Sequence, residues 1–177
     1  MALTVKVDPG THTIKITKNG YFPIKFSVNV GAGETKNISK TLIETNRFAI
    51  VGHGFPPSAY VGDTISASVQ VKNNSSVSDK AKVVVYYDGK TAETTVDLSA
   101  GQMKSVWFNI SFSSTGTKTI TIKTFVYVSE HENGAGWYET DSTTHTITIK
   151  EKKATLTITT SPSGAAVYID GKYVGTT

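Results

Sequence analysis

The chain has 177 residues and no cysteine. This absence excludes disulfide bonds, iron–sulfur clusters, thiolate zinc sites and a cysteine nucleophile. It does not assign a compartment, because extracellular proteins without disulfides are also found. No stretch resembles a signal peptide or is apolar for long enough to cross a membrane. We therefore expect no membrane span and, if the protein is exported, a mature or excised piece of it.

Helical periodicity is also missing. No long stretch places apolar residues at helical spacing, whereas threonine, valine, isoleucine and tyrosine, which favour strands, are used heavily. The sequence predicts an all-β protein. Clustered positive charge is lacking too, because the net charge of +4 comes from lysines spread singly along the expected strands and from one arginine, Arg47. Such charges are typical of solvated strand faces and guarded sheet edges, so we expect no nucleic-acid partner.

A catalytic constellation is the last absence. The four histidines, His12, His53, His131 and His145, are scattered, and no glycine-rich loop opens a helix. A nucleophile, acid or base needs partners within reach, and none is indicated here. We expect no enzyme activity, no cofactor and no metal centre.

Residues 154–177 predict half of a small β-domain. Leu156 and Ile158 alternate with threonine, and Val167 and Ile169 alternate again before Asp170-Gly171. That dipeptide is a strong hairpin signal, because both central residues of a type I′ turn need positive φ. The second arm, which includes Val174, is short, and a lone hairpin is marginal in water. We expect the domain to be completed by other residues.

Residues 1–43 supply strands of the same kind. The expected strands are Leu3–Val7 with Leu3, Val5 and Val7 on one face, a strand with Ile14 and Ile16, Tyr21–Val30, and Thr35–Leu42. Read tail to head, the two termini resemble one PEGA domain, a small β-domain of prokaryotic cell surfaces. The resemblance is carried by Ser161-Pro162-Ser163-Gly164-Ala165, Val167-Tyr168-Ile169-Asp170-Gly171, Val174-Gly175-Thr176-Thr177, Asp8-Pro9-Gly10-Thr11-His12 and Lys18-Asn19-Gly20-Tyr21. The chain departs from the name motif at Ser163, where the family has glutamate, and the halves are in reversed order.

Residues 47–150 predict an immunoglobulin-like β-sandwich. Seven or eight short strands with regular turns run from Phe48 to a last strand at Thr143–Lys150. This part resembles the CARDB family, immunoglobulin-like modules of archaeal and bacterial surface proteins. The residues that carry the resemblance are Tyr60-Val61-Gly62-Asp63, Val69-Gln70-Val71-Lys72-Asn73, Val84-Val85-Tyr86-Tyr87-Asp88-Gly89 and Leu98-Ser99-Ala100-Gly101-Gln102.

The stretch Ser129–Asp141 is expected to be a long loop between the last two sandwich strands. Its side chains include Glu130, Glu132, Trp137 and Tyr138. One interpretation is a solvated loop with the tryptophan packed back on the sandwich. The other is a contact surface, because tryptophan and tyrosine are favoured at interfaces. The acidic residues Glu130, Glu132, Glu139 and Asp141 would also suit Ca²⁺, although their spacing matches no known cation loop.

Four sequons begin at Asn37, Asn73, Asn74 and Asn109. Only the Asn73 and Asn74 pair lies in an obvious loop, so these two residues are the expected acceptors if N-glycans are attached.

Both resemblances imply a structural unit of an extracellular filament or surface layer. The alternative is a cell-surface adhesin or a glycan or cell-wall binding module that uses the loop around Trp137. Three routes would complete the terminal halves: closure of the chain on itself, adjacent repeats of a longer chain, or head-to-tail complementation between copies. Closure needs short linkers to span roughly 35 Å if the sandwich strands have about ten residues, so we favour complementation. The expected shared core contains Leu3, Val5, Val7, Ile14, Ile16, Leu156, Ile158, Val167, Ile169 and Val174.

Overall fold

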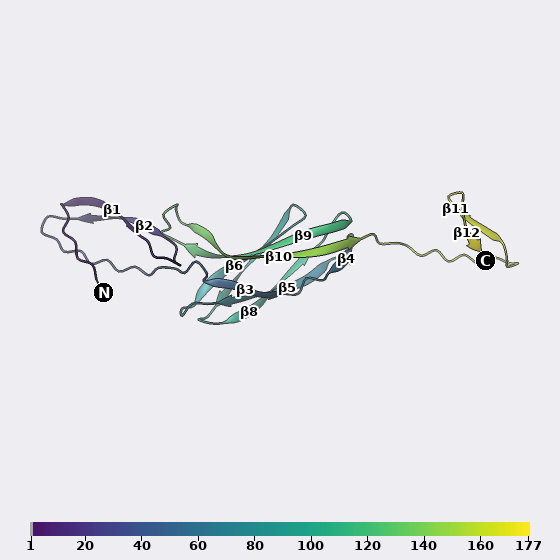
Figure 1. Cartoon of the computed structure of the whole chain (residues 1–177), viewed down its shortest axis with the longest axis horizontal. Coiled ribbons are helices and arrows are strands. Elements are labelled where there is room, and N and C mark those ends of the chain that lie inside the picture. The colour runs from purple at the N-terminus through teal and green to yellow at the C-terminus, as the bar shows by residue number, and fades with distance from the viewer. Residues whose placement is uncertain (1) are drawn as a thin grey trace.

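A computed structural model of the chain describes residues 2–177 and contains twelve strands, with no helix in that range (Figure 1). All-β architecture, predicted from composition, is confirmed. The strands are β1 (Gly10–Ile16), β2 (Ile24–Val30), β3 (Phe48–His53), β4 (Ser58–Tyr60), β5 (Ile65–Asn73), β6 (Asp79–Tyr87), β7 (Lys90–Leu98), β8 (Met103–Ile110), β9 (Gly116–Val128), β10 (Gly136–Lys150), β11 (Ala166–Ile169) and β12 (Lys172–Thr176).

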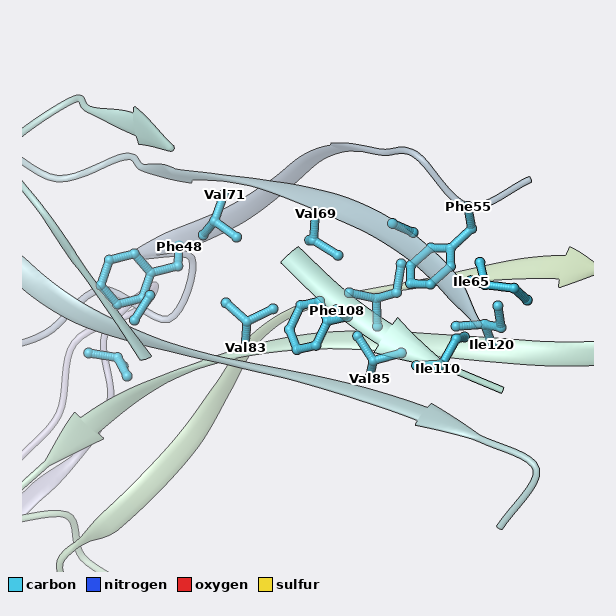
Figure 2. Close-up of a cluster of buried hydrophobic side chains, with 14 of the residues drawn as sticks. Phe48, Phe55, Ile65, Val69, Val71, Val83, Val85, Phe108, Ile110 and Ile120 are labelled. Atoms are coloured by element: carbon cyan, nitrogen blue, oxygen red, sulfur yellow. The ribbon is translucent and has the colours of Figure 1, made fainter. Parts of the chain in front are cut away.

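The eight strands β3 to β10 form the sandwich. One sheet has the order β4-β10-β9-β6-β7 and the other the order β3-β5-β8. Alternate residues of each strand face inward, as the period-2 pattern predicts, so Val69, Val85 and Ile122 are fully buried. Figure 2 shows this core, in which Phe48, Phe55 and Phe108 lie among valines and isoleucines from both sheets. Burying one such aliphatic side chain contributes about 1.5–3 kcal/mol.

The first strand of the sandwich changes sheets. β3 pairs antiparallel with β5, and β4 then pairs parallel with β10 at the end of the chain's last sandwich strand. The crossover keeps the chain running in one direction along the sandwich, so residues 47 and 150 lie at opposite poles. Figure 1 accordingly shows the two terminal regions at opposite ends of the sandwich.

The last hairpin is longer than predicted. β10 begins at Gly136 and pairs with β9 up to Val128, with a bulge between Glu139 and Asp141. The expected loop Ser129–Asp141 is therefore wrong in its second half, where Trp137 and Tyr138 are strand residues. A glycine at the strand start and the bulge hid the strand from the alternation pattern.

The N-terminal half consists of one hairpin, in which β1 pairs with β2 from Gly10↔Val30 to Ile16↔Ile24. The predicted strands Leu3–Val7 and Thr35–Leu42 are not formed, because neither segment pairs with a neighbouring strand. Residues 3–7 and 35–41 are instead exposed along their whole length.

The C-terminal half is the hairpin β11–β12. Asp170 and Gly171 both have positive φ, 49° and 79°, as the predicted type I′ turn requires. The alternating stretch 154–160 is not a strand, because it too lacks a pairing partner. Within residues 2–177, β11 and β12 pair only with each other.

Candidate functional site

The expected shared core is open on the N-terminal side. Leu3 is 90% exposed, Val5 65% and Val7 51%. Ile14 and Ile16 are half-buried on the inner face of β1, where Ile16 packs against the edge of the main core. Leu3, Val5 and Val7 form an alternating apolar row with no strand opposite them.

The C-terminal side carries a second open set. Leu156 is 70% exposed, Val174 55%, Ile169 40% and Ile158 39%, while Val167 is half-buried. On the other face of the same hairpin, Tyr168 pairs with Tyr173 and their ring centroids lie 5.6 Å apart. The hairpin thus has an aliphatic face and an aromatic face, and neither is covered.

The N-terminal half is fixed to the sandwich through aromatic stacking. The ring of His131, at the tip of the β9–β10 hairpin, stacks on Tyr138 at 3.6 Å between centroids and meets Phe22 edge-on at 5.9 Å. Phe22 and His131 are buried. Ile24 and His131 form an isolated β-bridge, so the backbone of the hairpin tip continues the β1–β2 hairpin.

Two ion pairs flank this stack. Lys40 Nζ lies 2.6 Å from Glu130 Oε1, and Lys15 pairs with Glu132. The hydrogen bond from Lys15 lowers the pKa of Glu132 below its usual range. Backbone bonds add to the contact, since the amide of Lys25 donates to Glu130 O at 2.8 Å. Glu130, Glu132 and Tyr138, predicted as a contact loop, therefore lie against the chain's own N-terminal half.

The acidic residues of the hairpin do not converge on a cation. Glu139 pairs with Lys123 at 2.7 Å, and Asp141 accepts a hydrogen bond from the amide of Ile50 at 2.8 Å. With Glu130 and Glu132 paired to lysines, each carboxylate has a separate partner. Residues 2–177 contain no group of three or more histidine, aspartate or glutamate side chains placed to hold a metal.

Residues 43–46 connect the N-terminal half to the sandwich, and this connector makes contacts with both of them. Phe22 N–H donates to Ile43 O at 2.9 Å, and Thr45 N–H donates to Gly20 O at 2.9 Å. Arg47, whose side chain is 4% exposed, reaches Glu44 at 2.6 Å and Asp79 at 3.0 Å. Arg47 thus joins the connector to β6, a role that sequence reasoning missed.

The two tryptophans differ in exposure. Trp137 is half-buried and packs edge-on against Tyr127 at 5.7 Å between centroids, on the outer face of the five-stranded sheet. Trp107, which the sequence did not single out, is 68% exposed. Its outward register in β8, between inward-facing Val106 and Phe108, was the available signal.

Asn73 is not a glycan acceptor in this fold. Its side chain is fully buried, and its Nδ2 donates to Val77 O at 2.8 Å and Leu98 O at 3.1 Å. The prediction of Asn73 as a glycan acceptor is therefore wrong, because the apparent loop is organised around this side chain. Asn74 is exposed, and its acceptor role stays a prediction.

Two histidines that are distant in sequence meet where β3 crosses toward β4. The rings of His53 and His145 lie 4.9 Å apart between centroids, beside Phe55. Burial is the main cause that lowers the pKa of His53 below its usual value, and the charge of the nearby His145 adds to the effect. His145 Nε2 lies 3.0 Å from Pro56 O, so the pair belongs to the packing of the crossover.

None of the described residues forms a helix that could span a membrane.

Comparison with protein families assigns the domains. The PEGA domain model matches residues 2–46 and 153–177, and the CARDB model matches residues 45–133, half of the chain. Both are non-catalytic domain types found in extracellular or surface-associated proteins. No curated protein matches the chain.

Several solved structures are similar to part of the chain. The CARDB domain of a Pyrococcus furiosus protein, solved in complex with di-metal ions, has 22% identity and a TM-score of 0.44 over 55% of this chain and 84% of that chain. A β-glucosidase from Listeria innocua has 15% identity and a TM-score of 0.41 over 59% of this chain, which spans only 16% of the glucosidase. A β-glucosidase from Erythrobacter marinus has 15% identity and a TM-score of 0.36; the match covers 68% of this chain and 18% of the glucosidase. Through its central domain the chain belongs to the CARDB family, and its two termini match the PEGA domain.

Proposed function

We propose that the protein is a structural subunit of an extracellular filament or surface layer. Copies assemble head to tail when the C-terminal half of one PEGA domain completes the N-terminal half on the next copy. The same assembly would form between adjacent repeats if the chain is part of a longer one.

The observation that carries this proposal is the pair of uncovered apolar sets at opposite ends of the molecule. Residues 2–46 and 153–177 match one domain family, yet they make no strand pairing with each other. Leu3 and Leu156 remain 90% and 70% exposed. An exposed row of apolar side chains is costly and is normally covered by a partner.

Strand complementation fits the chemistry of both sets. Main-chain hydrogen bonds would satisfy the unpaired backbone of residues 3–7 and 154–160, and alternate side chains would fill the common core. Because the tail of one copy meets the head of the next, the contact is heterologous and propagates unless rotation closes a ring.

The loop around Trp137 offers less to an outside ligand. Glu130, Glu132 and Tyr138 are engaged by the N-terminal half, and Trp137 is packed on Tyr127. These contacts favour the structural role over an adhesin that uses this loop.

The test replaces one residue of each aliphatic row by aspartate. Val5→Asp and Ile169→Asp each place an unpaired charge in the shared core, which is strongly unfavourable, so both variants should remain monomeric in sedimentation velocity and negative-stain microscopy. Thr4→Asp and Tyr168→Asp are matched controls, because adjacent strand residues face opposite sides, and both should still assemble.

Two results would overturn the proposal. In one, Val5→Asp or Ile169→Asp polymerises like the parent chain. In the other, the intact chain is a monomer whose two ends are paired within the same molecule.

A further inference from the structure

The outer face of the β3-β5-β8 sheet carries the most exposed aromatic side chain of the described residues. Trp107 is 68% exposed and lies in the middle of β8, at one edge of the sheet. Single exposed apolar residues are common and need no explanation by themselves. The surroundings of this indole are what distinguish it.

The neighbours of Trp107 are small and neutral. Ser68 lies directly opposite on β5, and Ser66 and Gln70 flank Ser68 on the same face. Along β8, Ser105 and Asn109 lie two residues away on either side and are exposed. Neighbours of this kind lie about 5–8 Å from the central residue, so hydroxyl and amide groups surround the indole.

The outer face of the other sheet carries charged side chains, unlike the surroundings of Trp107. The outer face of the five-stranded sheet carries the ion pairs Lys82–Glu93 and Lys123–Glu139. Around Trp107 the nearest charged side chain on the same face of β5 is Lys72, at the end of the strand, opposite Met103. An anionic ligand would require several lysines or arginines, and a protein partner would favour a wider apolar patch.

We propose that this face binds a neutral glycan. An exposed indole can pack against the C–H face of a pyranose ring, and surrounding hydroxyl and amide groups can donate to and accept from sugar hydroxyls. Trp107 does not line the hollow around Asp79 and Asp97 or the hollow around Tyr60 and Lys152. The polar neighbours of Trp107 follow the two strands β5 and β8, an arrangement that suits an extended chain lying along the sheet. The inference does not depend on head-to-tail assembly.

The experiment uses the full chain with Trp137→Phe, which leaves Trp107 as the sole fluorescent indole. It is titrated with maltoheptaose, cellohexaose and chitohexaose, and with polygalacturonate as the anionic control. A saturable change in tryptophan emission is expected with at least one neutral oligosaccharide. Calorimetry on the unsubstituted chain should give the same ligand preference.

Substitutions locate the site. Trp107→Ala should lower the affinity for that oligosaccharide at least about tenfold, as expected for removal of a central aromatic contact. Trp107→Phe should lose less, because a ring remains. Tyr127→Ala, on the opposite sheet, should bind like the parent.

Several outcomes would overturn the proposal: no saturable binding of any neutral oligosaccharide, binding of polygalacturonate alone, or equal affinity in the parent and Trp107→Ala. If Trp107→Ala abolishes self-association and leaves glycan affinity unchanged, the face is a contact between copies and not a glycan site.

Discussion

The two termini match the same small domain but have different surroundings. The N-terminal half is fixed to the sandwich through buried Phe22, the stacked rings of His131 and Tyr138, and two ion pairs. The C-terminal half is joined through an extended segment, at whose start Lys152 forms an ion pair with Asp63 of the sandwich at 2.7 Å. In the proposed assembly, the fixed N-terminal half is the acceptor and the tethered C-terminal half is the donor.

The strongest test of the fixed end is Arg47→Met. The substitution leaves Glu44 and Asp79 without their cation at a junction where Arg47 is almost fully buried, so we expect a loss of about 3 kcal/mol in the free energy of unfolding. Urea denaturation measures it. Lys80→Met is the matched control, because Lys80 and Asp97 are 53% and 81% exposed, and it should change stability by less than about 1 kcal/mol. Equal effects of the two substitutions would contradict the assigned junction.

Removal of the aromatic stack should release the acceptor without unfolding the sandwich. Tyr138→Ala deletes a half-buried ring that packs against both Phe22 and His131, and we expect a cost of about 1–2 kcal/mol. The amide of Lys25, which donates to Glu130 O, should then exchange faster with deuterium. Tyr168→Ala, in the donor, should leave that exchange rate unchanged. An unaltered Lys25 rate in Tyr138→Ala would mean that the stack does not hold the half-domain.

Much of this organisation could be predicted from alternation and turn residues. Asp88-Gly89 and Asp170-Gly171 both form hairpin turns with positive φ, and the inward rows of β5 and β6 are buried as expected. The predicted strands 3–7 and 154–160 are not formed, because alternation describes a strand's faces but does not supply a pairing partner.

The contacts between residues distant in sequence could not be predicted. His131 meets Phe22, and His53 meets His145, only after the chain has folded, and no local pattern marks either pair. Buried Asn73 was mistaken for a loop residue for the same reason: its hydrogen-bond partners Val77 and Leu98 include one far along the chain.

The sandwich itself should respond to acid at the β3–β4 crossover. The pKa of His53 is lowered in the folded state, so the unfolded chain binds the proton more readily. Stability is therefore unaffected above the usual histidine value of 6.5 and falls as the pH drops below it. Thermal melts of the parent and His53→Phe between pH 7.5 and 5.5, a range of about one unit on either side of that value, should diverge toward acid. Parallel curves would contradict the burial of this ring.

The smallest effect on stability is expected from the ion pair between Lys15 and Glu132. The pairing with Lys15 lowers the pKa of this carboxyl, so its contribution is present above the usual glutamate range and is lost as the pH falls through the lowered pKa. In Lys15→Ala the carboxyl of Glu132 should titrate at higher pH than in the parent, as followed by NMR. An unchanged titration of Glu132 would show that the acceptor is not held through this pair.

The most direct test of the central claim mixes two truncated chains. One lacks residues 154–177 and keeps the acceptor, and the other lacks residues 2–43 and keeps the donor. Each alone should be a monomer by size-exclusion chromatography with light scattering, and the mixture should form a one-to-one complex that grows no further. If the mixture stays monomeric while both sandwiches are folded by circular dichroism, the two terminal halves do not complete each other.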